Sequence, residues 1–302
     1  MDLLREQAVR EALFLHLDVL VAHSLDGLLR WQDTESFVFQ DERFSIRQTH
    51  GRGIGKPRAL EGALSITTTF TRYGDTPPYE DFEGTDGYPR YKYEGTDPNH
   101  SSNRSLRVCF EHGLPLVYFL GVQPGVYKAQ YPVYIIGDNP NALEVTLGFN
   151  KSEVGLDFSQ MTEVERRYAL VTSRQRLHQP IFRERVLHAY ATRCAVCSLR
   201  HRELLDAAHI ISDSKDDGDP VVPNGISLCK IHHAAFDRNF LGIRPDYRIV
   251  INSDLLQEKD GPMLTYGIQA MHDETLHLPS SARNRPDPDR LSVRFREFLQ
   301  AS

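Results

Sequence analysis

The segment from Cys194 to Asp237 constrains the fold of this chain more than any other stretch. It holds two pairs of metal-binding side chains, Cys194-x2-Cys197 and Cys229-x2-His232. Three thiolates and one imidazole are a donor set that structural zinc prefers, and both pairs have the spacing of zinc knuckles. Because one ion must bring the two pairs together, the sequence predicts a small domain stabilised by a structural Zn²⁺ that takes no part in chemistry.

His209 lies between the two pairs. Its segment, residues 204–211, is an apolar run with the pattern of a strand, and Asn224 begins the next element. A neutral imidazole with a pKa of about 6.5 can take a proton from water at physiological pH. His209 is therefore a candidate general base for a hydrolytic reaction.

His233 directly follows the expected zinc ligand His232, and Asp237 lies four residues further on. If residues 229–240 form a helix, His233 and Asp237 share one face while His232 points elsewhere. One helix would then serve two metal sites. Asp237 has an alternative role, because Ala-Phe-Asp also suits a packing and capping turn at the helix end.

In this order, these residues resemble those of HNH (ββα-metal) nucleases over roughly residues 180–245. The resemblance implies an endodeoxyribonuclease in which His209 is the general base and Asn224 orients its imidazole. It also implies that His233 binds a catalytic Mg²⁺, Mn²⁺ or similar divalent ion, and that the products carry 5′-phosphate and 3′-hydroxyl ends.

The chain departs from the commonest HNH pattern at one position. Many of these nucleases carry an Asp or His immediately before the base, where this chain has Ala208. Asp206 shares a strand face with Ala208, because side chains alternate along a strand. Asp206 and Asp237 are thus the two candidates to complete the catalytic metal site.

The N-terminal half contains a second informative region. Residues 73–103 are dense in Gly, Pro, Asp and Tyr with little periodicity, which is typical of a long functional loop. The chain reads Tyr-Glu-Asp from Tyr79, then Asn103-Arg-Ser-Leu, Gly113-Leu-Pro-Leu-Val-Tyr and Gly125-Val-Tyr-Lys. This order resembles the SRA (SET- and RING-associated) family over about residues 45–150. The resemblance implies a curved β-barrel of the SRA/PUA type that flips a modified cytosine out of duplex DNA.

A flipped base needs aromatic rings on its faces and hydrogen bonds along its Watson–Crick edge. By the resemblance, Tyr79 and Tyr93 stack on the base, and Asp81 accepts a hydrogen bond from the cytosine amino group. Tyr88 and Tyr91 are further candidates, since the loop is longer than in the eukaryotic relatives. The alternative for each tyrosine is packing in the barrel with its hydroxyl satisfied.

Other residues of this half are assigned more loosely. Glu94 stands where the relatives have Thr after the second stacking Tyr, so the pocket chemistry differs there. Lys56, Arg58 and Arg104 are candidates to contact the DNA backbone. Asn103 and Arg104 suit either a phosphate contact or a helix cap, and the sequence does not separate these roles.

Hydrophobic patterning predicts the elements around these sites. We expect one helix and part of another in residues 3–31, and helices in residues 160–190 that Pro180 divides. A hairpin is expected from 37–39 and 44–46, and a last helix runs through Phe295 and Leu299. Further strands are expected at residues 64–70, 116–120, 125–129, 133–136, 143–147 and 248–252.

Composition sets outer bounds on function. The chain has 35 Lys and Arg against 41 Asp and Glu, a net charge of −6, which argues against non-specific coating of nucleic acid. It shows no apolar run long enough to span a membrane, and charges occupy the place of a signal-peptide core. Four cysteines, three of them at metal-ligand spacing, suit a reducing bacterial-type cytoplasm.

Together these patterns predict an α+β chain with an SRA-like recognition domain in residues 1–160, a helical linker in 161–180 and an HNH domain in 181–302. The leading hypothesis is a type IV, modification-dependent restriction endonuclease that reads 5-methylcytosine or 5-hydroxymethylcytosine in double-stranded DNA. A lone HNH site cuts one strand, so double-strand cleavage implies a homodimer. The alternatives are an HNH nuclease that reads an unmodified sequence, N6-methyladenine or phosphorothioate, and a modified-DNA reader that does not cleave.

Overall fold

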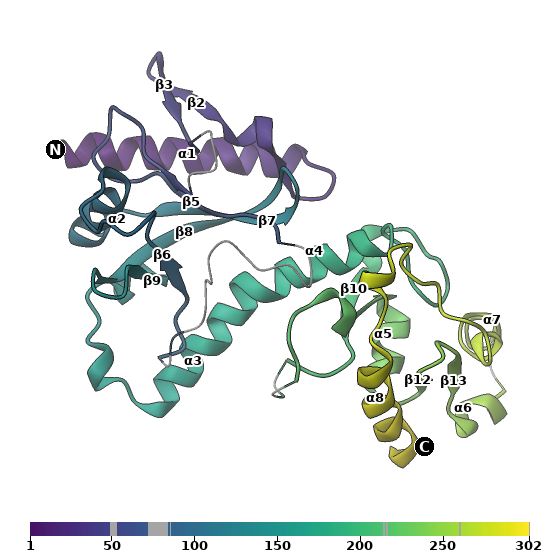
Figure 1. Ribbon diagram of the computed structural model, residues 1–302. Coiled ribbons are helices and arrows are strands. Elements are labelled where there is room, and N and C mark those ends of the chain that lie inside the picture. The colour runs from purple at the N-terminus through teal and green to yellow at the C-terminus, as the bar shows by residue number, and fades with distance from the viewer. Residues whose placement is uncertain are drawn as a thin grey trace. The chain divides into compact units, whose positions relative to one another are not determined.

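The computed structural model describes residues 1–48, 53–71, 84, 86–213, 215, 217–259 and 261–301. The chain divides into two compact units, Met1–Ile181 and Phe182–Ser302 (Figure 1). Each unit has its own hydrophobic core. In the described ranges, no helix has the length and apolar character needed to cross a membrane.

The first unit is built on a mixed sheet that curls into a half-barrel (Figure 1). Its described strands lie in the order β4-β5-β7-β8-β9-β6, and β1 pairs with β8. The long strand β8 pairs with β7 in its first part and with β9 in its second part, and β5 and β7 form the parallel pair. The strand bounds are β1 Leu29–Arg30, β4 Ile54–Gly55, β5 Ser65–Thr68, β6 Arg90–Lys92, β7 Leu116–Gln123, β8 Val126–Asn139 and β9 Glu144–Gly148.

One helix packs on each face of this sheet because side chains alternate along its strands. Val117 and Phe119 of β7 face the same core as Leu13 of helix α1 (Leu3–His23). Leu116 and Tyr118 face the other core, which includes residues of helix α2 (Ser101–His112). The α+β class is confirmed, whereas the SRA/PUA assignment of this unit stays a prediction.

Several sequence expectations for this unit are confirmed and two are corrected. The hairpin is present as β2 (Ser36–Phe39) and β3 (Glu42–Ser45). After α1, the expected part of a second helix is replaced by β1 and a 3₁₀ turn, Trp31–Thr34, because residues 29–30 pair with β8. The two strands expected in residues 125–136 are one strand, β8.

Pro180 does not divide the connecting helices as expected. Helix α3 (Glu163–Ser173) passes through a π-helical turn, Arg174–His178, into helix α4 (Gln179–Ala189). Pro180 is the second residue of α4. A proline has no N–H to donate to the preceding turn, and widening that turn to a π-helix lets the helix continue.

The second unit contains a ββα arrangement. Strands β10 (Leu205–His209) and β11 (Gly225–Cys229) form an antiparallel pair, and helix α5 (Lys230–Asp237) follows β11 without a loop. The remaining elements are β12 Leu241–Ile243, β13 Ile249–Ile251, α6 Ser253–Gln257, α7 Pro262–Gly267 and α8 Pro288–Ala301. Short 3₁₀ turns lie at Lys151–Glu153 and Phe158–Gln160 in the first unit and at Arg202–Leu204, Val222–Asn224, Gln269–Met271 and Ala282–Asn284 in the second.

Candidate active site

His209 ends strand β10 and lies opposite Gly225 of strand β11. Helix α4 packs against this point of the hairpin so closely that a Cβ on Gly225 would stand 2.8 Å from Cζ of Phe182. Phe182 is buried, and its ring stacks on the His209 imidazole with centroids 4.0 Å apart and planes 16° apart. The absence of a side chain at Gly225 therefore allows an aromatic ring to fix the plane of the candidate base.

The electrostatic surroundings of His209 keep its imidazole neutral. Burial lowers its pKa from 6.5, the nearby Asp213 and Asp237 act to raise it, and His233 acts to lower it. The Nε2 atom is buried and has no hydrogen-bond partner among the described residues. A neutral, unpaired ring nitrogen is the form that a general base needs.

Asn224 stabilises the backbone beside His209. Its buried amide donates to the carbonyl oxygens of Ile211 at 2.9 Å and Asp219 at 3.0 Å, and its Oδ1 accepts from the Ile211 amide at 2.9 Å. None of these bonds reaches the imidazole. Any effect of Asn224 on the orientation of His209 thus passes through the main chain of residues 209–211.

His233 lies between the two carboxylates that the sequence proposes as metal ligands. Its Nδ1 is 3.4 Å from Oδ2 of Asp206, and its Nε2 is 3.4 Å from Oδ2 of Asp237. Two ligands of one Mg²⁺-sized ion stand about 3 Å apart, so either carboxylate fits a site shared with the imidazole. The carboxylates contact opposite nitrogens, so the three residues do not surround one point.

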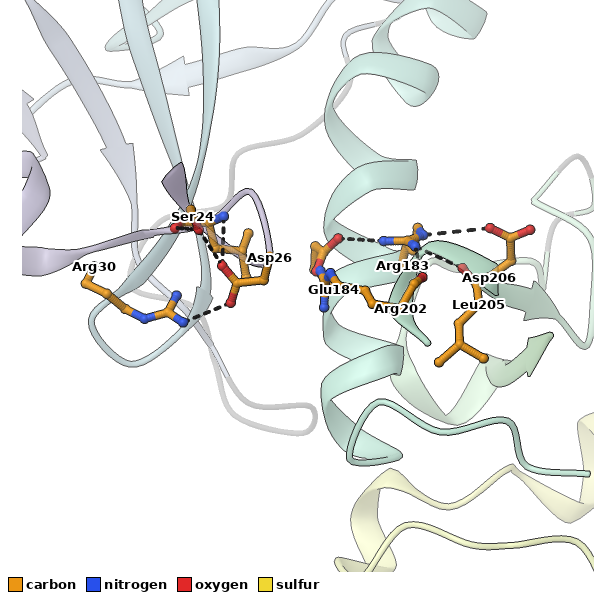
Figure 2. Close-up of polar contacts among 9 residues, drawn as sticks. Ser24, Asp26, Arg30, Arg183, Glu184, Arg202, Leu205 and Asp206 are labelled. Carbon is orange, nitrogen blue, oxygen red and sulfur yellow. Dashed lines mark hydrogen bonds and ion pairs between the residues drawn. The ribbon is translucent and has the colours of Figure 1, made fainter. Parts of the chain in front are cut away.

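Two cations hold Asp206, and the local sequence pattern identifies neither of them. Lys230 Nζ is 2.6 Å from its Oδ2, and Arg183 Nε is 3.7 Å from its Oδ1 (Figure 2). Burial opposes ionisation of Asp206, but hydrogen bonds from Lys230 and His233 outweigh it and keep the pKa of this carboxyl below 3.8. Asp206 is therefore ionised and already neutralised by side chains of this unit.

Arg183 anchors helix α4 to the start of the hairpin. Figure 2 shows its guanidinium between Glu184 and Asp206, and it also donates to the carbonyl oxygens of Leu205 at 2.9 Å and Arg202 at 3.0 Å. Arg202 forms an ion pair with Glu184 in turn. These contacts join residues far apart in the sequence, and no local motif signals them.

The cysteine cluster forms a second group next to the candidate site. Among the described residues, Cys194, Cys197, Cys229 and His232 place one ligand atom each within 4.8 Å of one another. The distance between the Cys197 and Cys229 sulfurs is 4.0 Å, and His232 Nδ1 is 3.6 Å from the Cys194 sulfur. A tetrahedral zinc site with bonds of about 2.3 Å and 2.0 Å separates its sulfurs by about 3.8 Å and a sulfur and nitrogen by about 3.5 Å.

The surroundings of this cluster also suit a cation. His232 Nε2 donates to the Gly267 carbonyl oxygen at 2.7 Å, which leaves Nδ1 to face the sulfurs as a ligand. Hydrogen bonding to the Cys194 and Cys229 sulfurs raises the pKa of Cys197 far above its usual range. Three thiolates this close need a positive ion between them, and the expected Cys3His set is thus brought together in a form compatible with zinc.

The structure packs three of the expected base-stacking residues into the hydrophobic interior of the first unit. Tyr88, Tyr91 and Tyr93 are 6%, 5% and 2% exposed. The Tyr91 hydroxyl donates to the Thr67 carbonyl oxygen at 3.2 Å, and the Tyr93 hydroxyl donates to the Asp138 carboxylate. In this arrangement they pack the sheet and offer no open face to a base, because neighbouring side chains cover their rings.

The other expected residues of this unit lie partly outside the described residues. Tyr79 and Asp81 fall in the range 72–83, of which nothing is described. Arg58 and Arg104 are exposed and Lys56 is half-buried, so their side chains are accessible to a phosphate.

The Asn103 side chain bonds to the loop that precedes helix α2. Its amide accepts from the Glu94 amide and donates to the carbonyl oxygens of Glu94 and Asp97, at 2.9, 3.0 and 2.8 Å. Asn103 is the third residue of helix α2, whose N-cap is His100, so these bonds attach the loop of residues 94–97 to the helix.

Comparison with known proteins gives one informative match. Residues 194–244 match the family described as HNH endonuclease. A search of curated proteins finds no match for the chain. Among solved structures, a modification-dependent TagI restriction endonuclease is 17% identical over 82% of this chain and 86% of that chain, with a TM-score of 0.29. The family match covers the cysteine cluster, His209, Asn224 and His233, and the chain therefore carries an HNH endonuclease domain in its second unit and is a DNA endonuclease.

Proposed function

We propose that this protein is a modification-dependent restriction endonuclease, in which the first unit reads a modified cytosine and the HNH domain cuts nearby. The observation that carries the nuclease half is the placement of an unpaired neutral imidazole, His209, close enough to His233 and Asp237 for their charges to shift its pKa. This constellation suits hydrolysis of a phosphodiester by water.

His209 is the general base in this proposal. Its buried Nε2 accepts a proton from the attacking water, and the stacked Phe182 ring keeps the imidazole in plane during the transfer. The imidazolium that forms gains from the negative charges of Asp213 and Asp237, which favour its protonated state. The ring can then pass its proton to solvent, which returns the base to its starting form.

His233 and one carboxylate hold the catalytic divalent ion. When bound, Mg²⁺ or Mn²⁺ polarises the scissile phosphate and stabilises the leaving 3′-oxygen. We favour Asp237 over Asp206 as its carboxylate partner, because Asp237 influences the pKa of His209 whereas Asp206 is engaged by Lys230 and Arg183. Asp206 then acts as a positioning residue through its contact with His233 Nδ1.

The Cys3His cluster holds a structural Zn²⁺ in this proposal. Cys229 and His232 flank the start of α5, so an ion bound there fixes the helix that carries His233. All four ligand positions are filled by protein atoms, which leaves no place for a reacting water. The proposed zinc therefore acts on the site only by holding its frame.

The first unit is the proposed reader of 5-methylcytosine or 5-hydroxymethylcytosine. Support comes from the order of sequence segments shared with SRA domains and from the curled sheet. Tyr79 and Asp81 remain the proposed stacking and hydrogen-bonding residues, and the exposed Arg58 and Arg104 suit phosphate contacts. Because one HNH site cuts one strand, we further propose that two copies act together to cut both strands.

The test is digestion of matched duplexes that differ only in carrying C, 5-methylcytosine, 5-hydroxymethylcytosine, N6-methyladenine or phosphorothioate. We expect cutting of the cytosine-modified duplexes and loss of cutting by about 10²-fold or more in His209→Ala, with binding of modified DNA retained. His201→Ala, which removes an exposed histidine of the same unit, is the matched control and should cut normally.

Each alternative predicts a different pattern in this panel. Equal cutting of modified and unmodified duplexes would remove the reader half of the proposal. Selective cutting of the N6-methyladenine or phosphorothioate duplex would replace it with another specificity. Binding without any metal-dependent cutting by the unaltered protein would leave only a non-cleaving reader.

A further inference from the structure

The first unit contains a cavity that neither the nuclease site nor the proposed base pocket uses. It has a volume of about 370 Å³ and lies between the 3₁₀ turn Trp31–Thr34 and the hairpin β2–β3. Trp31, Thr34, Ser36 and Ser45 are among the residues that line it. Cavities of this size hold small organic ligands, and a lone inorganic ion would fill only part of it.

The most unusual lining residue is Arg47, whose side chain is almost fully buried. Only 6% of Arg47 is exposed. Its guanidinium lies over the rings of Trp31 at 4.4 Å and Tyr127 at 3.8 Å from their centroids. Its Nε donates to the Thr67 hydroxyl at 3.1 Å and its Nη1 to the Thr34 hydroxyl at 3.2 Å. All of these partners are neutral.

A second buried arginine in the same unit shows what a purely structural one looks like. Arg10 is 1% exposed and forms an ion pair with the buried carboxylate of Glu6. It also donates to the carbonyl oxygens of Pro115 and Ala63 at 2.9 and 2.8 Å. Among the described residues, Arg47 has no such carboxylate partner. Burying a cation without a counter-charge is costly unless an anion completes the site.

The charges around the cavity favour an anion. Arg43 and Arg47 contribute two positive charges to its lining, and Glu35 contributes one negative charge. Glu35 and Arg43 are exposed, whereas Arg47 lies inside. The lining therefore carries a net positive charge, its buried charge is that of Arg47, and guanidinium groups bind phosphate oxygens well.

We propose that this cavity binds the phosphate group of a nucleotide, with Arg47 as the buried anion receptor and Trp31 as a wall for the attached nucleoside. The nucleotide is either part of a DNA strand or a free nucleoside monophosphate. This site goes beyond the proposed function, since it involves no residue of the HNH domain and none of the residues assigned to the modified base.

Trp31 makes the proposal directly measurable, because it is the single tryptophan of the chain. Its fluorescence is followed while the full-length protein, without divalent metal, is titrated with inorganic phosphate, deoxycytidine 5′-monophosphate or an unmodified 20-base-pair duplex. We expect a saturable change with the monophosphate or the duplex, at lower concentration than with phosphate alone. A response to the duplex alone identifies a backbone site, and a response to the monophosphate identifies a free-nucleotide site.

Charge variants of the exposed lining residues should change the Kd in opposite directions while the Arg47 side chain is kept, although Ser45→Glu also removes the hydrogen bond from the Ser45 hydroxyl to the Arg47 carbonyl oxygen. Ser45→Glu adds a carboxylate to the cavity and should raise the Kd at least about tenfold, whereas Glu35→Gln removes one and should lower it about two- to fivefold. Arg30→Ala, which removes an exposed arginine paired with Asp26 outside the cavity, should leave the Kd unchanged.

Arg47→Lys keeps the charge and should still weaken binding, because an ammonium lacks the planar fork of the guanidinium. Far-UV circular dichroism establishes that each variant is folded. The proposal is overturned if no probe changes the fluorescence of the unaltered protein, or if Ser45→Glu and Glu35→Gln bind the probes equally well. Cleavage plays no part in this readout, so failure here and failure of the nuclease proposal are separate results.

Discussion

His232 and His233 are neighbours in helix α5, yet they lie in very different surroundings. His232 is 2% exposed, and its Nδ1 belongs to a closed set of four ligand atoms within 4.8 Å of one another. The side chain of His233 is 26% exposed and lies between two carboxylates that contact its opposite nitrogens. A closed set suits an ion that stays in place, whereas an open one leaves room for water and a phosphate.

Helix geometry explains how one short element serves both groups. Consecutive residues point about 100° apart around an α-helix, so His232 and His233 face different neighbours. The partner spacings follow from the same geometry, with Cys229 three residues before His232 and Asp237 four residues after His233. The comparison teaches that a structural site and a working site can share a helix when their ligands occupy different faces.

Removing a ligand of the Cys3His cluster should have the largest effect. Cys194→Ala takes away a fully buried ligand, and structural zinc contributes on the order of 10 kcal/mol to the folding of small domains. We expect loss of bound zinc, loss of the second unit's melting transition and loss of all cleavage. Metal analysis and calorimetry measure these effects. Cys109→Ala, which removes a buried thiol of the first unit, is the control and should keep its zinc; an unchanged melt in Cys194→Ala would contradict the structural role.

Altering the carboxylates beside His233 should lower activity and leave the fold intact. Asp237→Asn removes the carboxylate that we favour as metal ligand, and we expect kcat to fall by about 10²- to 10³-fold with zinc content unchanged. Asp206→Asn should lower kcat only about tenfold, as expected for a residue that positions His233. Single-turnover cleavage at several Mn²⁺ concentrations measures both, and the reverse order of effects would assign the metal to Asp206.

Asn224→Ala tests the backbone beside His209. The amide is fully buried and makes three hydrogen bonds to the backbone of Ile211 and Asp219, so its removal leaves buried polar groups unpaired. We expect the unfolding free energy to fall by about 2 to 4 kcal/mol, together with a decrease in kcat. Denaturant unfolding provides the measurement. A normal stability with a large loss of kcat would instead indicate direct contact with the imidazole during the reaction.

The local sequence predicts the cysteine cluster and the ββα frame because their key pairs are close in the chain. Cys229-x2-His232 and the alternation around His209 fix which side chains share a face before any tertiary contact is known. The match of residues 194–244 to the HNH endonucleases confirms the type of domain predicted from these patterns.

The parts that could not be predicted depend on contacts between distant segments. Phe182 stacks on His209 although the two residues are 27 positions apart in the sequence, and the stacking is possible because Gly225 has no side chain. Tyr91 and Tyr93 occur in a polar, glycine-rich segment, yet pairing of β6 with β9 buries them. Residue type and spacing do not distinguish a tyrosine that stacks on a base from one that packs a sheet.

The smallest effect should come from Phe182→Leu, which tests whether the stacked ring controls the base. Burial is the largest influence on His209 and lowers its pKa from 6.5. The neutral form is the active one, so activity should fall as pH drops through this lowered pKa. Leucine leaves one face of the imidazole open to water, and the pKa should rise toward 6.5, moving the acid limb of kcat upward by less than about one pH unit.

The sign of the stability effect follows from the same shift. Because the folded-state pKa lies below the unfolded value of 6.5, the unfolded chain binds the extra proton and the fold loses stability as pH falls below that value. Phe182→Leu should reduce this acid-linked loss. Rate profiles and thermal melts between pH 5 and 8 measure both effects. An acid limb that stays in place in Phe182→Leu would mean that groups other than the ring set the pKa of His209, with Asp213, Asp237 and His233 the next to vary.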